Sequence, residues 1–239
     1  MAAAAGTWAF AFPAVRRMKQ LLLQGGLATD CLQEAMADIE NDEETGSFVI
    51  GRGGYPNKDG IIQCDAAIME GQPGRFGAVA ALPGVGTPLA VARKVMEEAP
   101  HSFLVGDGAV AFAENQGFIV EENNSMMSKH STEAYQEYLE NERMLKKHDT
   151  LATGDGDMIM CFCPCFHVIL LMKEGMSPMD ACQTVVQDIL QRTGKENMFE
   201  LGIIAMNMKG EVGAASSMSF PYCIWSQGKD VVEQLVHEA

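Results

Sequence analysis

Residues 148–157 read HDTLATGDGD, and the assignment of the fold depends on this stretch. It follows residues 131–147, which are polar and helix-forming but only weakly amphipathic. Taken alone, His148-Asp149-Thr150 is typical of a helix cap, because short polar side chains hydrogen-bond to the ends of helices. The stretch becomes informative only together with the motifs on either side of it.

Short motifs surround this stretch in a defined order. They are Thr7-Trp8, Gly51-Arg52-Gly53-Gly54-Tyr55-Pro56, Asp65-Ala66-Ala67-Ile68-Met69, Gly77-Ala78-Val79-Ala80, Ala90-Val91-Ala92-Arg93-Lys94-Val95, Leu104-Val105-Gly106 and Ala111-Phe112-Ala113. The ordered series resembles the glycosylasparaginase family of N-terminal-nucleophile amidohydrolases, and the resemblance runs from Thr7 to Trp225. The series is similar, more distantly, to plant-type L-asparaginases and isoaspartyl peptidases.

The resemblance implies that the chain cuts itself between Asp149 and Thr150. The threonine hydroxyl attacks the preceding carbonyl, the acyl group shifts from nitrogen to oxygen, and water releases it. Thr150 then carries a free α-amino group, with an ordinary pKa of about 8, that acts as general base for its own hydroxyl. Asp149 is expected to matter for this cleavage and not for turnover.

The resemblance also implies a substrate and oxyanion site after the nucleophile. Thr153 and Gly154 match a pair that donates hydrogen bonds to the oxyanion, a contribution of about 3 kcal/mol in other enzymes. Asp155 and Gly156 extend this segment. Trp8 matches a tryptophan that lines the substrate pocket, and core packing is the alternative role. The Thr-Trp pair near the N-terminus favours glycosylasparagine over free asparagine or isoaspartyl peptides as substrate.

The expected fold class is α+β, a four-layer αββα sandwich of the N-terminal-nucleophile hydrolase type. It forms a single domain over residues 1–239, which self-cleavage would divide into an α chain, 1–149, and a β chain, 150–239. Hydrophobic periodicity predicts helices over 13–24, 29–40, 88–98, 107–116 and 178–191. Strands are predicted over 47–50, 61–69, 76–82 and 103–105, and a meander over 202–208, 212–218 and 222–225. The predicted helix caps are Thr29 or Asp30, Thr87, Asp107 and Ser177.

One segment of the family pattern is absent after Thr150. The family places central strands and a Gly-Arg-Val-Gly-Asp-Ser-Pro stretch there, whose arginine and aspartate clamp the substrate's α-carboxylate and α-amino group. Here only Leu151-Ala152 separates Thr150 from Thr153, at most about 10 Å of extended chain. Two residues cannot form a strand, a turn and a returning strand. We therefore expect part of the central sheet to be missing, and little or no turnover.

Three functions follow as hypotheses. The first is an amidohydrolase that cleaves the side-chain amide of glycosylasparagine and releases aspartate. The second is a catalytically impaired or dead family member that acts as a non-enzymatic subunit. The third is L-asparaginase or isoaspartyl peptidase activity.

Charge and composition restrict the partners. The net charge is −15, which repels phosphate backbones and argues against nucleic acid. Since no hydrophobic run is long enough to cross a bilayer, no membrane partner is expected. The expected partners are a small glycosylasparagine or asparagine-type substrate and, by resemblance, further copies of the cleaved chains. No cofactor is expected. The acidic run over residues 38–44 is interpreted as a solvated loop whose spacing does not match a calcium site.

The cysteines do not form a disulfide pattern. There are seven, an odd number, so reduced and mostly buried thiols are expected. Cys161, Cys163 and Cys165 form a cluster whose spacing is unusual for zinc, so we interpret them as core thiols, with a metal site as the alternative. No metal ion is expected.

The compartment is predicted only from the resemblance, which implies the lysosome. Residues 1–13 are apolar but have no basic n-region, so they make a poor signal peptide, and the cytoplasm is the alternative. The sequon Asn123-Asn124-Ser125 matters only if the chain enters the secretory pathway.

Overall fold

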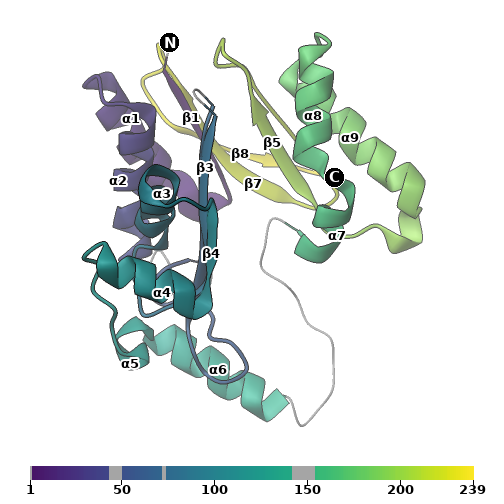
Figure 1. The fold of residues 1–239 in the computed structure, drawn as a ribbon. Coiled ribbons are helices and arrows are strands. Elements are labelled where there is room, and N and C mark those ends of the chain that lie inside the picture. The colour runs from purple at the N-terminus through teal and green to yellow at the C-terminus, as the bar shows by residue number, and fades with distance from the viewer. Residues whose placement is uncertain (1, 43–49, 72–73, 142–153) are drawn as a thin grey trace. The chain divides into compact units, whose positions relative to one another are not determined.

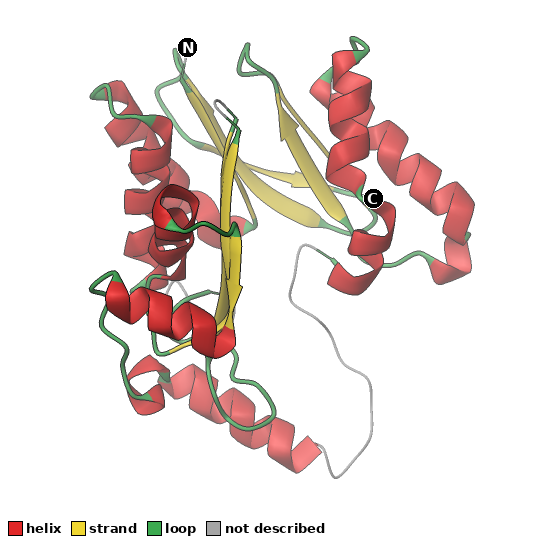
Figure 2. Cartoon of the chain, in the orientation of Figure 1, coloured by secondary structure: helices red, strands yellow, loops and turns green. Residues whose placement is uncertain are grey.

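The computed structural model describes residues 2–42, 50–71, 74–141 and 154–239. These residues form both helices and strands, which confirms the α+β class (Figures 1 and 2). They divide into two compact units, Met1–Gly26 with Asp149–Ala239, and Leu27–His148. The four-layer sandwich and the single domain over 1–239 stay predictions. Among the described residues, no helix is both long and apolar enough to cross a membrane.

The unit Leu27–His148 is built around one three-stranded sheet. Strand β2 (Gln63–Glu70) pairs antiparallel with β3 (Arg75–Pro83), and β3 pairs parallel with β4 (Phe103–Val105). The parallel pair requires a crossover, which α3 (Pro88–Glu98) provides. Helix α4 (Gly106–Asn115) follows β4 and also packs on β3. The predicted strands over 61–69, 76–82 and 103–105 and the predicted helices over 88–98 and 107–116 are therefore confirmed.

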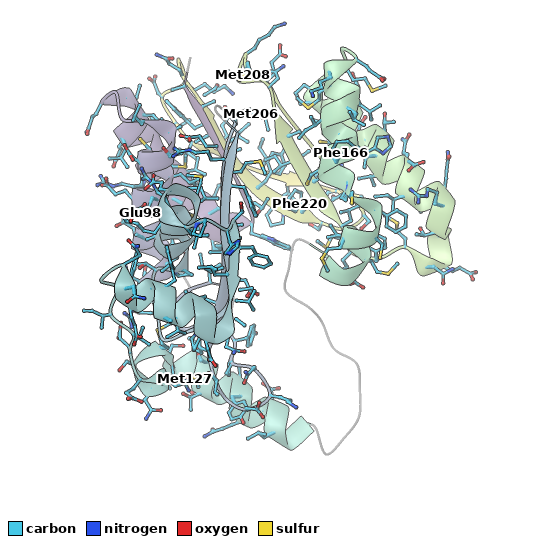
Figure 3. All side chains as sticks on the ribbon, viewed as in Figure 1. Glu98, Met127, Phe166, Met206, Met208 and Phe220 are labelled. Carbon is cyan, nitrogen blue, oxygen red and sulfur yellow. The ribbon has the colours of Figure 1, made fainter. Side chains whose placement is uncertain are left out.

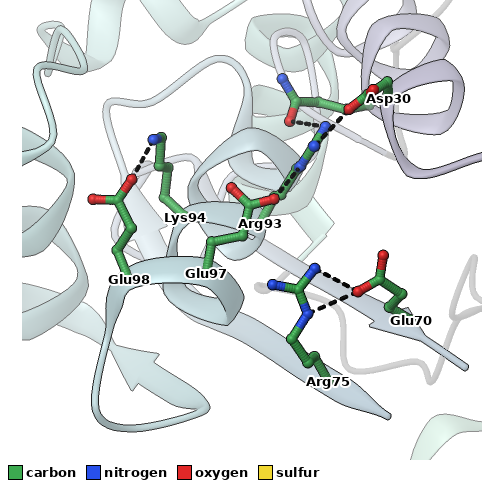
Figure 4. Close-up of polar contacts among 8 residues, drawn as sticks. Asp30, Glu70, Arg75, Arg93, Lys94, Glu97 and Glu98 are labelled. Carbon is green, nitrogen blue, oxygen red and sulfur yellow. Dashed lines mark hydrogen bonds and ion pairs between the residues drawn. The ribbon is translucent and has the colours of Figure 1, made fainter. Parts of the chain in front are cut away.

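Helix α2 (Ala28–Glu40) is tied to α3 by Arg93 (Figure 4). The guanidinium donates from Nη2 to Asp30 Oδ1 at 2.5 Å, from Nη1 to Gln33 Oε1 at 3.2 Å and from Nε to Glu97 Oε1 at 2.8 Å. Its side chain is mostly buried while that of Asp30 is half exposed, so the contacts orient the helices more than they stabilise them.

Arg52 joins three segments of the same unit. Its Nη1 donates to Glu121 Oε2 at 2.8 Å and to the Ser125 carbonyl at 3.1 Å, and its Nη2 donates to the other Glu121 oxygen. Nε lies 3.3 Å from Asn41 Oδ1, just beyond the end of α2. The glycine-rich motif around Arg52 is thereby fixed to the segment before α5 (Asn123–Met126).

Asn123 also joins two segments of this unit, through an uncharged side chain. Its Nδ2 donates to the Gly60 carbonyl at 2.8 Å, and its Oδ1 accepts from the Ile62 amide at 2.9 Å. Helix α6 (Lys129–Asn141) follows, and Tyr135 Oη donates to the Lys58 carbonyl. Both contacts fix the connection that leads into β2.

The second unit contains two separate sheets. Strand β7 (Phe220–Ser226) lies between β1 (Ala3–Thr7) and β8 (Glu233–His237), antiparallel to both. Strands β5 (Gly202–Met206) and β6 (Val212–Ser216) form an antiparallel hairpin.

Helices of this unit cover the two sheets. Beside the first sheet, a short 3-10 turn, η1 (Ala9–Ala11), leads into α1 (Phe12–Leu23). The hairpin packs against α9 (Pro178–Thr193), which is preceded by α7 (Gly156–Phe162) and α8 (Pro164–Lys173) and followed by η2 (Lys195–Asn197).

The predicted three-strand meander is wrong. Strands β5 and β6 pair as expected, but β7 pairs with the N-terminal β1 and the C-terminal β8. The pairing joins segments that are far apart in the sequence. Ala3–Thr7 is Ala-rich and lacks the two-residue alternation that marks a strand, yet it pairs with β7 from Ala3↔Ser226 to Thr7↔Tyr222. Sequence periodicity therefore predicts neither β1 nor its pairing.

The helix caps were harder to predict than the helices. Ser177 caps α9 as expected, its Oγ accepting from the Asp180 amide at 3.1 Å. The N-cap positions of α2 and α4 are Leu27 and Val105, so the predicted caps Thr29, Asp30 and Asp107 are wrong. Thr87 occupies the N-cap of α3 without a side-chain cap bond to the described residues. Residues 47–49 of one predicted strand lie outside the described residues.

Candidate functional site

The predicted site is only partly within the described residues. Asp149, Thr150 and Thr153 lie outside them, so their roles stay predictions. Trp8, Gly154, Asp155 and Gly156 are described, and all four belong to the unit formed by Met1–Gly26 and Asp149–Ala239.

Gly154 is held in a conformation that only glycine tolerates. It is buried, has φ +121°, and forms an isolated antiparallel bridge with Leu201. A Cβ atom at this position would lie 1.8 Å from the Glu200 carbonyl oxygen. Since β5 begins one residue after Leu201, this bridge holds Gly154 beside the start of β5.

Asp155 and Gly156 serve the local structure. The Asp155 amide donates to the Glu200 carbonyl at 2.8 Å, and its Oδ1 accepts from the Met158 amide at 3.3 Å. Asp155 is thus the N-cap of α7, and Gly156 is the first residue of that helix. Because the Asp155 amide is already engaged, it is not free to donate to an oxyanion in this arrangement.

Trp8 lies at the end of β1 with an unusual backbone, φ 67° and ψ 158°. Its amide donates to the Pro221 carbonyl at 2.7 Å, and its own carbonyl accepts from Cys223 Sγ at 3.7 Å. Its half-buried ring meets Phe220 edge-on, with centroids 5.9 Å apart. Such backbone strain costs on the order of 1–3 kcal/mol, and it occurs often at functional sites.

Phe220 lies between the Trp8 ring and the first residue of β5. Phe220 receives the Trp8 ring and also lies over Gly202, where a Cβ would come within 2.7 Å of the Phe220 ring. Gly202 follows Leu201, the bridge partner of Gly154. Phe220 therefore packs both against the Trp8 ring and against the strand that follows the bridge partner of Gly154.

Glu40 is a titratable residue for which the sequence predicted no special role. Only 3% of its surface is exposed, although the acidic run was interpreted as a solvated loop, so that interpretation is wrong for this residue. Oε1 accepts from the Leu89 amide at 3.1 Å, and Oε2 has no partner among the described residues. Burial raises the pKa of Glu40 to about 8, against the opposing effect of the Leu89 hydrogen bond.

The cavity beside Glu40 has a volume of about 320 Å³ and is lined by Met36, Ile62 and Cys64. Burial and, to a smaller extent, the nearby Glu40 charge raise the pKa of the Cys64 thiol to about 12. A signal for this burial exists in the sequence. Glu40 lies four residues after Met36 and beside buried Ile39, so the apolar face of α2 extends to it.

The cysteine cluster is not in the core. Cys161, Cys163 and Cys165 are exposed, so the prediction of core thiols is wrong, while the other four cysteines are buried. Cys163 adopts a left-handed conformation, φ 47° and ψ 49°, that ends α7 and starts α8, and this turn carries the cluster outward. No cysteine forms a disulfide, and the described residues contain no group of three or more potential metal ligands.

The sequence matches the asparaginase family model over residues 4–151 and again over residues 149–236. The class of protein is therefore an α+β amidohydrolase with the N-terminal-nucleophile hydrolase fold of that family. The two matched parts cover nearly the whole chain, and the chain belongs to the asparaginase family. The parts meet at residues 149–151, where the nucleophile is predicted.

The chain is also similar to individual members of the family. An N(4)-(beta-N-acetylglucosaminyl)-L-asparaginase from Elizabethkingia miricola is 29% identical over 275 residues, covering 91% of this chain and 77% of the relative. An isoaspartyl peptidase/L-asparaginase from Mus musculus is 39% identical over 127 residues, 53% of this chain and 37% of its own length. A plant-type L-asparaginase from Pyrococcus horikoshii is 45% identical over 96 residues, which cover 40% of this chain and 30% of the relative.

The lengths of these matches bear on the missing segment. The alignment with the Elizabethkingia protein, 275 residues, is longer than the 239 residues of this chain. The relative therefore has residues without a counterpart here, which agrees with the predicted absence of an internal segment. Along most of its length the chain is glycosylasparaginase-like.

Proposed function

We propose that this chain is an amidohydrolase that cleaves the side-chain amide of asparagine derivatives, glycosylasparagine in particular, and releases aspartate, with little turnover because the segment that clamps the substrate is absent. Thr150 is the nucleophile, and its α-amino group becomes the general base after self-cleavage at Asp149. The observation that carries the proposal is the family match over residues 4–151 and 149–236, whose two parts overlap at this peptide bond.

The described residues support this assignment locally. Gly154, four residues after Thr150 in the sequence, is held by the backbone of Glu200 and Leu201. That contact holds Gly154 in place, and fixed donors are what an oxyanion site needs, because misplaced donors lose most of their effect. Trp8, which has a strained backbone and lies edge-on to Phe220, would supply an aromatic wall for a sugar or an amide.

The first experiment measures the intact mass of the purified chain. Self-cleavage is expected to give two fragments, 1–149 and 150–239, and Thr150→Ala is expected to leave one chain. Hydrolysis is then followed as aspartate released from aspartyl-N-acetylglucosamine and, separately, from L-asparagine. Release by the wild type that disappears in Thr150→Ala supports the proposal, whereas equal release by both proteins contradicts it.

A second candidate function is a catalytically impaired family member that acts as a non-enzymatic subunit. The specific observation is the sheet: among the described residues, the only strand that pairs with β5 is β6, apart from the single bridge to Gly154. A central strand with one partner leaves backbone groups unpaired. One intact chain together with no aspartate release would favour this function over the first.

Three broader features belong to the same proposal. The fold would be a four-layer αββα sandwich with part of its central sheet missing, and the cleaved chains would form a homo-oligomer. The lysosome is the proposed compartment and the cytoplasm is the alternative. Fractionation of cells that express a C-terminally tagged chain tests the compartment directly.

A further inference from the structure

Only one oxygen of the Glu40 carboxyl group has a partner among the described residues. The side chain extends from the last residue of α2 to α3, where Oε1 accepts from the amide of Leu89, the second residue of that helix. Oε2 is buried and has no hydrogen-bond partner in the part of the chain that the structure describes. Because buried polar atoms in native proteins almost always have a partner, the unpaired oxygen points to a partner from outside the chain.

Glu40 also lines the cavity of about 320 Å³. Its carboxyl group is close to two other lining residues, Leu89, which donates to Oε1, and Cys64, on whose thiol the Glu40 charge acts. Cavities of roughly 300–1,000 Å³ with mostly apolar walls are the usual sites for small molecules. The apolar residues of this wall are Met36, Ile50, Ile62, Ala66, Pro88 and Leu89. The cavity therefore has the size and the lining for a small organic ligand.

At neutral pH the unpaired oxygen is a hydrogen-bond donor. Burial raises the pKa of Glu40 to about 8, so most molecules keep the proton on this carboxyl group. Since Oε1 accepts from the Leu89 amide, the proton belongs on Oε2. The described lining residues include no Lys, Arg or His, so an anion finds no counter-charge there. A cation would have to expel the proton and form a buried ion pair, whose desolvation is costly. A neutral ligand with an acceptor avoids both costs.

Two polar side chains of the wall already have partners. Cys64 Sγ donates to the Gly51 carbonyl at 3.8 Å, and Asp65 Oδ1 accepts from the Ala81 amide at 2.7 Å. A hydroxyl or amino group on the ligand would bring hydrogens that need acceptors of their own, whereas a carbonyl oxygen only accepts. The donor at Glu40 and the apolar wall therefore suit a carbonyl compound best.

We propose that this cavity binds a small neutral carbonyl compound such as a ketone. The carbonyl oxygen accepts a hydrogen bond from Glu40 Oε2, and the apolar part of the ligand packs against Met36 and Ile62. The site belongs to the unit Leu27–His148 and does not depend on cleavage or catalysis by Thr150.

Titration of the full chain with 2-pentanone tests the site, because a ketone has no amide bond to hydrolyse. Binding is followed by the NMR shift of the Met36 methyl group, assigned with Met36→Leu. Ala66→Leu fills the cavity and is expected to weaken binding about tenfold. Ala99→Leu is the matched control, because Ala99 packs on the same core without lining the cavity, so the affinity should stay within about twofold. Absence of a saturable Met36 shift, or equal affinities of the two variants, would overturn the proposal.

The pH dependence identifies the donor. Loss of the Glu40 proton removes the hydrogen bond, so the wild-type affinity is expected to fall about tenfold from pH 6.5 to pH 9. Arg52, whose amide donates to the Glu40 carbonyl, directs its guanidinium to Glu121. The other titratable residues of the described wall are Tyr55, Cys64 and Asp65. A variant of Glu40 itself separates its effect from theirs.

Glu40→Gln keeps an acceptor for Leu89 and places an amide donor where Oε2 was. Its affinity is expected to stay within about threefold of the wild type at pH 6.5 and to be the same at pH 9. Glu98→Gln is the matched control, because Glu98 lies at the other end of α3 and pairs with Lys94, so this variant should keep the wild-type fall (Figure 3). Butylammonium replaces the ketone in a parallel titration. A fall with pH that persists in Glu40→Gln, or tighter binding of butylammonium than of 2-pentanone at pH 6.5, would contradict the proposal.

Discussion

Glu40 shows how one buried carboxyl group makes stability depend on pH. Its pKa is raised from 4.5 to about 8, because burial disfavours the charged form. Below pH 4.5 the folded and unfolded chains both hold the proton, and the stabilisation from neutral Glu40 is fully present. As the pH rises towards 8, the unfolded chain releases the proton while the folded chain keeps it, so the free energy of unfolding falls.

The substitution Glu40→Gln removes this titration while keeping an acceptor for the Leu89 amide. The variant is expected to melt at a higher temperature than the wild type at pH 8.5 and at a similar temperature at pH 4.5. Calorimetry at several pH values measures the difference. The control is Glu98→Gln, because hydrogen bonding to Lys94 lowers the pKa of Glu98. Parallel wild-type and Glu40→Gln curves from pH 4.5 to 8.5 would contradict the prediction.

Gly154 and Gly156 form a natural pair for testing the bridge to Leu201. Gly154→Ala places a Cβ against the Glu200 carbonyl at φ +121°, and it is expected to cost at least about 3 kcal/mol and to block any self-cleavage. Gly156→Ala meets nothing within 4 Å and lies in a helix, so it should be neutral or stabilise by roughly 0.5–1 kcal/mol. Chemical denaturation of both variants provides the comparison, and equal effects would argue against the bridge as an anchor.

Individual site residues could be predicted from the sequence only where a motif carried them. Gly154 lies within a recognisable motif, and the structure shows why no other residue fits there. The apolar face of α2 hinted at the burial of Glu40, but its hydrogen-bond partner could not be predicted, because Leu89 lies far along the chain in α3. The edge-on contact of Trp8 with Phe220 joins opposite ends of the sequence and has no local signal.

At the scale of elements, loss of the ion pair between Arg52 and Glu121 should lower the free energy of unfolding measurably. It donates to both oxygens of Glu121, and both side chains are mostly buried. Arg52→Lys retains the charge but loses the forked geometry, so it is expected to cost about 1–2 kcal/mol. Arg75→Lys is the control, since the Arg75 side chain is 42% exposed against 20% for Arg52, and it should change stability by less than about 0.5 kcal/mol. Urea denaturation measures both, and equal costs would refute the distinction.

Helices were predictable because their signal is local. The apolar periodicity of α1, α2, α3 and α9 placed them within one or two residues of their observed bounds. Strand partners were not predictable in the same way. The β7 segment had an evident strand pattern, yet its neighbours come from the two ends of the chain.

At the scale of the whole molecule, the net charge of −15 should control self-association. If two copies of the chain associate, as in the proposed homo-oligomer, their acidic surfaces repel each other, and salt screens that repulsion. Raising NaCl from about 50 mM to about 500 mM is therefore expected to tighten the dimer several-fold, since the Debye length falls well below 10 Å. Sedimentation at both salt concentrations measures this. Weaker association at high salt would indicate an interface held by ion pairs instead.

The family of the whole chain was more predictable than the geometry of its site. Ordered motifs spread over most of the sequence indicated the family, and the match over residues 4–151 and 149–236 confirms it. The position of Thr150 relative to Trp8 is a property of the assembled chain. Such a position depends on contacts between distant segments, which spacing along the sequence does not encode.

The two hydrogen bonds made by the Asn123 side chain determine how the chain should respond to N-glycosylation. In a host that exports it, a sugar attached to this asparagine during translocation would replace an Nδ2 hydrogen that bonds Gly60 and would place bulk beside Ile62. Glycan-bearing molecules should then misfold and be retained, and only the unmodified fraction should be recovered. Export of Ser125→Ala, which lacks the sequon, should raise the yield, whereas cytosolic expression of the same variant should leave it unchanged.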